Sequence, residues 1–156
     1  MRQADRRTGR PPRRRILAAA AGMVLTLVSA SSAATEPRLR TYRVGEHSHY
    51  DRVVWQFTGG LPSSHARWVR TVHADGSGFP VPLEGRAFLQ LTLNGVEWLH
   101  VPHEPTLTRR FAVLRQMKPA GAFEGVLTFG LGLSRRVQYR FSKLHHPDRL
   151  VLDLRR

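Results

Sequence analysis

The sequence predicts an all-β fold, a sandwich of about eight short strands, and two observations support this prediction. Beyond position 38, apolar and polar residues alternate in short runs, which is the period of a half-buried strand. Turns that contain glycine or proline separate these runs, and no stretch of more than about two turns shows a helical period. The chain has no cysteine, so hydrophobic packing alone must hold the sheets together.

Four runs in the first half of this region have the alternation of strands: 39–44, 50–57, 66–73 and 87–93. In the second run, Trp55 shares a face with two apolar neighbours, so we expect it in the core. The segment 79–83 is at best an edge strand, because Pro80 and Pro82 cannot donate a backbone hydrogen bond.

The second half of the region contains four more runs of this kind: 109–117, 123–129, 137–142 and 147–154. The segment 94–108 shows no period and is the longest irregular stretch, which makes it a place for local specialisation. The sequence Gly130-Leu131-Gly132 is interpreted as a turn, and His145-His146-Pro147 as the turn before the last strand.

The last strand has two different faces, and its apolar face holds Leu150, Leu152 and Leu154. Its other face carries Arg149 and Asp153. The strand at 50–57 has the complementary pattern, so we expect the two strands to pair. In that arrangement Arg52 or Arg140 would bridge Asp153 across the ladder.

The first 34 residues are predicted to be a cleavable signal peptide, followed by a linker over 35–41 and the sandwich domain over 42–156. Arg13-Arg14-Arg15 precede the apolar run 16–28, which is too short to span a bilayer, and small residues follow it. The basic segment is compatible with the general secretory or the twin-arginine route. We expect an exported protein without stable membrane insertion; an uncleaved anchor is the alternative.

The formal charge of the chain is +14, and most of it is arginine. The first 34 residues hold seven arginines and one aspartate, which leaves +8 for the remainder. The guanidinium group is a planar fork that matches carboxylate and phosphate groups, and a cell wall is rich in both. The charge therefore favours an anionic envelope polymer as partner, although it would also serve solubility.

Several segments resemble the AMIN domain, a β-sandwich module of bacterial envelope proteins. The opening strand of that family, Arg-Val-Val-aromatic-x-aromatic, is similar to 52–57, and its closing strand is similar to 147–154. The middle of the chain, at 75–82 and 123–133, looks like the AMIN-like domains of secreted actinobacterial proteins. The resemblance covers nearly all of the chain after the predicted signal and implies an AMIN-like β-sandwich.

AMIN domains generally attach to amidases, secretins or other periplasmic proteins and help to localise them to peptidoglycan. The resemblance thus implies a secreted, non-catalytic module that associates with the cell wall, with peptidoglycan or an anionic wall polymer as ligand. The alternatives are a protein-interaction module of an envelope complex and a small secreted hydrolase. We expect no cofactor and no nucleic-acid partner.

Six residues are the candidate ligand-binding positions: Arg52, Trp68, Arg70, Arg140, Arg149 and Asp153. The charged members on the terminal strands point away from the apolar faces, so a ligand can reach them. Trp68 lies among arginines in the sequence, and an aromatic ring beside arginines suits a glycan or an anion. The same ring could instead cap the edge of the sandwich. Because it lies in the irregular segment, Trp98 is expected to be a second accessible tryptophan.

We expect no catalytic residue and no metal site. The sequence His100-Val101-Pro102-His103 lacks the i, i+4 spacing of a helical zinc motif, and its prolines exclude a helix. Ser77 lies between two glycines, but no helix follows it as a nucleophile elbow requires. The acidic residues show no spacing that pairs two carboxylates for glycoside cleavage.

Overall fold

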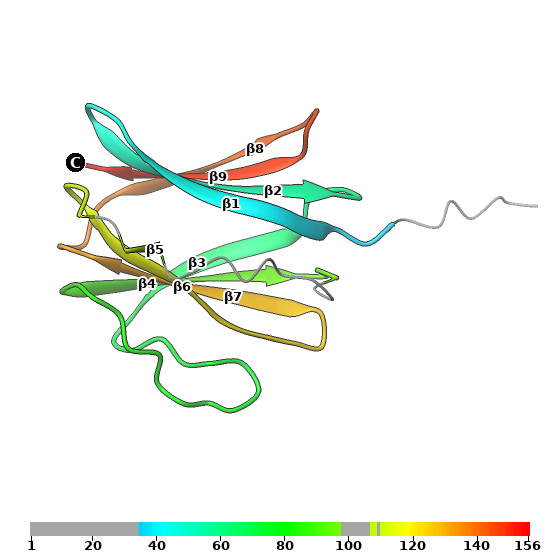
Figure 1. The fold of residues 1–156 in the computed structure, drawn as a ribbon, viewed down its shortest axis with the longest axis horizontal. Coiled ribbons are helices and arrows are strands. Elements are labelled where there is room, and N and C mark those ends of the chain that lie inside the picture. The colour runs from blue at the N-terminus through cyan, green and yellow to red at the C-terminus, as the bar shows by residue number, and fades with distance from the viewer. Residues whose placement is uncertain (1–34, 98–106, 109) are drawn as a thin grey trace, which may run out of the picture. The chain divides into compact units, whose positions relative to one another are not determined.

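A computed structural model describes residues 35–97, 107–108 and 110–156 of the protein. These residues form nine strands in two antiparallel sheets that face each other, with no helix among them (Figure 1). The predicted all-β sandwich is therefore confirmed. Three parts of the sequence discussed above lie outside the described residues: the predicted signal peptide, Trp98 and the His100-to-His103 cluster. The residues that are described contain no helix long and apolar enough to cross a membrane.

The first sheet, called sheet A, has the strand order β1-β2-β9-β8. Its strands are β1 (Arg38–Glu46), β2 (Tyr50–Thr58), β9 (Arg149–Arg155) and β8 (Tyr139–Leu144). The predicted pairing of the opening and closing strands is confirmed, because β2 and β9 are antiparallel neighbours in the centre of the sheet. Strand β1 begins at Arg38, inside the segment 35–41 that the sequence predicts as a linker.

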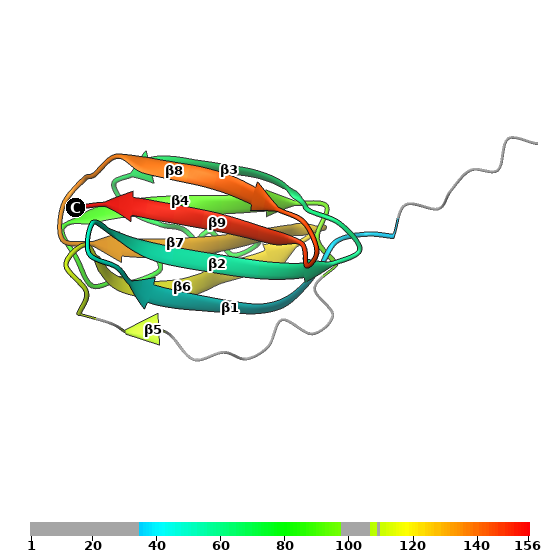
Figure 2. The same ribbon diagram turned by 90° about the horizontal axis from the view of Figure 1, so that it is seen from above.

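The second sheet, called sheet B, has the strand order β3-β4-β7-β6-β5. Its strands are β3 (Ser63–Val69), β4 (Ala87–Asn94), β7 (Val126–Leu133), β6 (Leu114–Phe123) and β5 (Leu107–Thr108). Seen from above, β8 and β3 run along one side of the sandwich, and β1 and β5 lie along the opposite side (Figure 2).

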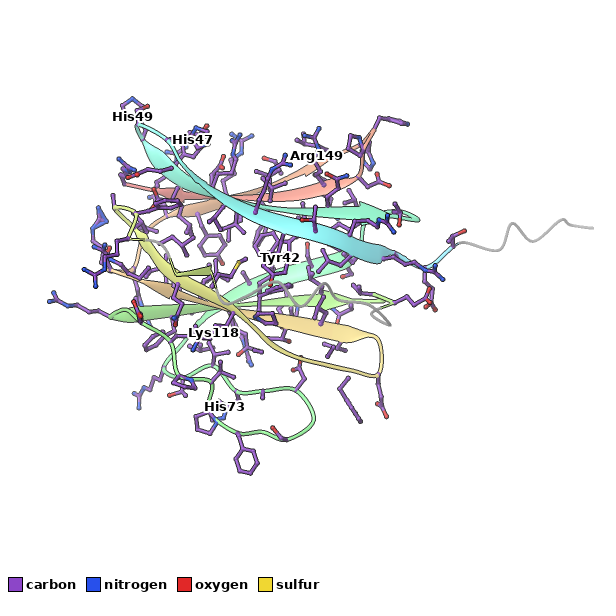
Figure 3. All side chains as sticks on the ribbon, in the orientation of Figure 1. Tyr42, His47, His49, His73, Lys118 and Arg149 are labelled. Carbon is purple, nitrogen blue, oxygen red and sulfur yellow. The ribbon has the colours of Figure 1, made fainter. Side chains whose placement is uncertain are left out.

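The core lies between the two sheets and is built around aromatic rings. Trp55 is fully buried, and its ring centroid lies 5.6 Å from that of Phe129; Tyr42 contacts the same phenylalanine at 5.2 Å, edge to face (Figure 3). Leucines from the inward faces fill the rest: Leu89, Leu91, Leu93, Leu127, Leu131, Leu150, Leu152 and Leu154. The predictions that Trp55 and the leucines of the last strand are buried are confirmed.

Three predicted strands are displaced along the chain: 66–73 is replaced by 63–69, 109–117 by 114–123, and 123–129 by 126–133. Strand β6 continues past Pro119 because the register shifts between Pro119 and Gly121, so the proline lies at an irregularity rather than at the end of the strand. The segment 79–83, predicted as at best an edge strand, is not a strand in the described structure. It contributes one isolated antiparallel bridge, between Pro80 and His73.

The prediction of a turn at 130–132 is wrong, because these residues lie within β7. The side-chain positions of Gly130 and Gly132 face away from the core, toward the long connection between β3 and β4 that runs below sheet B in Figure 1. A Cβ atom on Gly132 would overlap the carbonyl oxygen of Glu84, and one on Gly130 would lie 2.8 Å from the Leu83 side chain. Gly132 therefore allows a close approach of backbone to backbone, and Gly130 leaves room for the Leu83 and Val72 side chains; close approach is the other reason for glycine in a strand.

A buried carboxylate joins the two sheets. Asp51 of β2 has no exposed surface, and its Oδ2 accepts the backbone N–H groups of Val113 and Leu114, at 2.7 and 2.8 Å, where β6 begins. Its Oδ1 accepts a hydrogen bond of 3.1 Å from the Arg156 guanidinium, which also contacts Glu46 at 2.5 Å. Asp51 thus connects sheet A, sheet B and the last residue of the chain.

We expect the substitution Gly132→Ala to lower the free energy of unfolding by about 3 kcal/mol or more, because the added methyl group meets a backbone oxygen that cannot move alone. Gly45→Ala is the matched control: its Cβ would be 3.7 Å from the nearest atom, so we expect no loss of stability. Urea unfolding of both variants checks the account, and equal stabilities would contradict it.

We expect Asp51→Ala to cost about 3–5 kcal/mol, because two buried N–H groups lose their acceptor. Glu46→Ala removes the exposed partner of the same arginine and should cost about 0–1 kcal/mol. The comparison is made by thermal and urea unfolding, and a loss in Asp51→Ala no greater than that in Glu46→Ala would exclude the inter-sheet role.

Candidate binding face

Four of the six predicted ligand-binding residues lie on the outer face of sheet A. Strand alternation turns Arg52, Arg149 and Asp153 away from the core, and the register places Arg52 and Arg140 on either side of Asp153. Arg149 points away from sheet B in Figure 3. We call this surface the arginine face and define it by Arg43, Arg52, Arg140, Arg149, Arg155 and Asp153.

The central contact of the arginine face is the ion pair between Arg52 and Asp153. Nε and one terminal nitrogen of the guanidinium donate to the two carboxylate oxygens, at 2.6 and 2.8 Å. The hydrogen bond to Asp153 raises the pKa of Arg52 above its ordinary value, and the same guanidinium lies 4.8 Å above the Tyr50 ring. Of the two bridges that the sequence leaves open, the structure forms the one from Arg52.

The other arginines of this face keep their charge uncompensated. Within the described part of the chain, Arg43, Arg140 and Arg155 have no ion pair, and Arg149 donates to the carbonyl oxygen of Pro147 at 3.3 Å. The face therefore presents planar cationic groups around one carboxylate that is already paired. Such a surface attracts polyanions and has donors free to bind them.

A shallow groove begins where β8 starts, on the side of the sandwich where β8 lies over β3. It has a volume of about 420 Å³, and its lining residues are Trp68, Val137, Gln138, Tyr139, Arg140 and Arg155. Trp68 is half-buried against the core and meets the Tyr139 ring at 6.1 Å, while Arg136 lies 5.6 Å above its ring. Trp68 thus both closes the edge of the sandwich and lines the groove.

Arg70 is separate from these residues. It lines another groove, of about 600 Å³, formed by the β3–β4 connection and Phe88 on sheet B. The structure therefore brings Arg52, Arg140, Arg149 and Asp153 together and places Trp68 beside them through the groove. Arg70 lies apart from them, at the start of the β3–β4 connection.

The histidines before the last strand belong to a turn, as predicted. Nδ1 of His145 lies 2.9 Å from Oδ1 of Asp148, three residues further along the chain. Among the described residues, no group of three or more histidine, cysteine, aspartate or glutamate side chains is placed to hold a metal ion.

Sequence reasoning missed three arginines of this region. Arg155 continues the alternation of Arg149 and Asp153, so the pattern of the last strand contained the signal. Arg43 lies opposite Val54, but an irregular register between Leu39 and Thr41 obscures its alternation. Arg136 precedes β8, and nothing in its local sequence points to the Trp68 ring.

Comparison with known protein families agrees with this architecture. The model of the AMIN-like domain matches residues 37–156. The chain belongs to the AMIN-like domain family. No curated protein matches the chain. The match includes every described strand of this AMIN-like domain, so the arginine face and the groove lie within the family module.

We expect Arg52 and Asp153 to be coupled in a double-mutant cycle with Arg52→Gln and Asp153→Asn. The coupling free energy should be about 1 kcal/mol, because the pair is bidentate but partly exposed to solvent. The parallel cycle with Arg140→Gln should give a value near zero. A larger coupling of Asp153 to Arg140 than to Arg52, measured by urea unfolding, would contradict the geometry.

Proposed function

We propose that this AMIN-like protein is a secreted, non-catalytic module that binds an anionic polymer of the bacterial cell envelope through the arginine face. The observation that carries the proposal is the gathering of five arginines around a single, already paired carboxylate on one sheet face. The AMIN-like family and the predicted signal peptide support the envelope as the place of action.

The geometry of a strand suits a repeating ligand. Residues that alternate on one face of a strand are separated by about 7 Å, and neighbouring strands lie about 4.8 Å apart. Arginines from β1, β9 and β8 therefore form a fixed two-dimensional array. Each guanidinium can bind a carboxylate or a phosphate with two parallel hydrogen bonds, so phosphodiester and carboxylate polymers both match the array.

Binding by this face needs no chemical step. Arginine stays protonated near neutral pH, so it does not act as an acid or a base there. The two central valines of the face, Val54 and Val151, are 8% and 4% exposed although they point away from the core. The long side chains around them cover apolar surface while their charged ends stay in water, which is usual for arginine.

We expect the variant Arg43→Gln/Arg149→Gln to bind isolated cell walls about thirtyfold more weakly than the wild type, since each of the two arginines contributes about 1 kcal/mol near an anionic surface. Co-sedimentation with purified sacculi over a range of salt concentrations checks this. The apparent affinity of the wild type should fall steeply with salt, because exposed charges are screened. The variant should depend on salt less strongly.

The matched control is Arg67→Gln/Arg86→Gln, which removes the same charge from exposed positions on and beside sheet B. Equal weakening by both pairs would show that net charge, not the arginine face, causes retention. Sacculi stripped of their covalently attached anionic polymers identify the ligand: retention by stripped walls indicates peptidoglycan, and its loss indicates the anionic polymer. Absence of wall binding by the wild type would overturn the proposal.

A further inference from the structure

We infer that the free edge of β8 binds an extended acidic peptide as an additional strand of sheet A. This inference goes beyond the proposed wall binding, because it concerns a protein partner and uses the backbone at the edge of the sheet rather than the arginine face.

The edge of β8 is open. Within the described residues, β8 pairs with β9 alone and ends the strand order of sheet A. The N–H of Arg155 donates to the carbonyl oxygen of Gln138, which places Arg140 and Ser142 in the hydrogen-bonded pairs with β9. The N–H and C=O groups of the alternate residues therefore point outward; these residues are Tyr139, Phe141 and Lys143. A bound peptide would pair with this row of groups.

The groove supplies contacts for one face of such a peptide. It runs beside the start of β8, and Trp68, Val137 and Tyr139 contribute its apolar part. The Tyr139 hydroxyl donates to the carbonyl oxygen of Ala66 on β3 at 3.0 Å, which fixes the ring at the junction of the two sheets. Because strand side chains alternate, every second residue of the peptide would turn toward this groove. Short apolar side chains match it.

The charges around the edge select the other face of the peptide. Arg140 lies on the outer face of β8 and lines the groove together with Arg155, which shares that face. Lys143 pairs with the inward Leu150, so it is exposed on the opposite face of the strand, and Arg136 lies over the Trp68 ring. The nearest carboxylate in the register, Asp153, is already held by Arg52. Acidic side chains on the outer face of the peptide would thus gain cationic neighbours, and basic ones would be repelled.

The same charges argue against a second copy of this chain as the occupant. Two β8 strands that paired edge to edge would bring Arg140 and Lys143 of one copy close to those of the other. Charged residues on edge strands commonly prevent such pairing. The charge pattern therefore favours a different chain, one with acidic residues at alternate positions.

The probe is a capped hexapeptide of alternating glutamate and valine. We expect the full-length protein to bind it, and the amide hydrogens of Tyr139, Phe141 and Lys143 to exchange at least tenfold more slowly when it is saturated. Amides of Arg140 and Ser142, which already bond to β9, should change less. The exchange is followed by NMR, and saturation without added protection at the three outward amides would overturn the inference.

Two modified peptides test the backbone pairing without altering the protein. N-methylation at alternate positions blocks one edge of the peptide, and methylation at the remaining positions blocks the other edge. We expect one pattern to weaken binding at least tenfold and the other to have little effect. A peptide in which lysine replaces glutamate should not bind. Equal binding by both methylated peptides would contradict strand addition.

Lys143→Pro removes one outward N–H while the pairs of Arg140 and Ser142 with β9 remain, and Lys143→Ala removes the same side chain but keeps the donor. We expect weaker peptide binding in the proline variant than in the alanine variant, and unchanged wall retention in both. Equal peptide binding by the two variants, with folding verified by urea unfolding, would overturn the inference.

The double variant Arg43→Gln/Arg149→Gln should weaken wall retention and leave peptide binding intact. The proposals of wall binding and of peptide binding can therefore fail separately.

Discussion

The architecture depends on the burial of one carboxylate. A charged group without solvent contact is tolerated only where hydrogen bonds or an opposite charge replace water, and Asp51 has both. Its oxygens hold the start of β6 on the opposite sheet and the guanidinium of the last residue. These bonds tie β2, which lies in the centre of sheet A, to the opposite sheet and to the end of the neighbouring strand β9. Alternation then determines the outer face, because the neighbour of the inward Asp51 is the outward Arg52.

The two sheets differ in what covers their outer faces. On sheet B, Gly130 and Gly132 leave room for the β3–β4 connection, and Arg86 and Glu84 of that connection bond to Leu133 and Gln116. On sheet A, long arginine side chains surround two valines, and no described segment crosses the face. The arginine face is therefore the outer sheet surface that no described connection covers. Because Gly130 and Gly132 let a connection cover sheet B, sheet A is the one whose outer face stays open for the proposed binding.

Local patterns were sufficient to predict the strands that alternate cleanly, the pairing of the opening and closing strands, and the burial of Trp55. They were insufficient where a residue type has two physical uses. Gly130 and Gly132 suggest a turn, whereas they allow a close approach by residues far away in the sequence. Proline cannot donate a backbone hydrogen bond, yet Pro119 lies within β6, at an irregularity of its register.

The candidate site shows the same limit. Alternation placed Arg52, Arg140, Arg149 and Asp153 on one face, but it could not choose between Arg52 and Arg140 as the partner of Asp153, because both flank it in the register. The choice depends on side-chain conformation and on the Tyr50 ring beneath Arg52. The role of Asp51 was also hidden, since its partners are at positions 113, 114 and 156.

The most direct test of the central claim is an NMR titration of the protein with a soluble anionic wall polymer, observed at the arginine Nε–H resonances. Our account predicts that the resonances of Arg43, Arg149 and Arg155 shift together and saturate, while those of Arg67 and Arg86 stay in place. Saturable shifts confined to the arginines of sheet B, or shifts of equal size on both sheets, would contradict the assignment of binding to the arginine face.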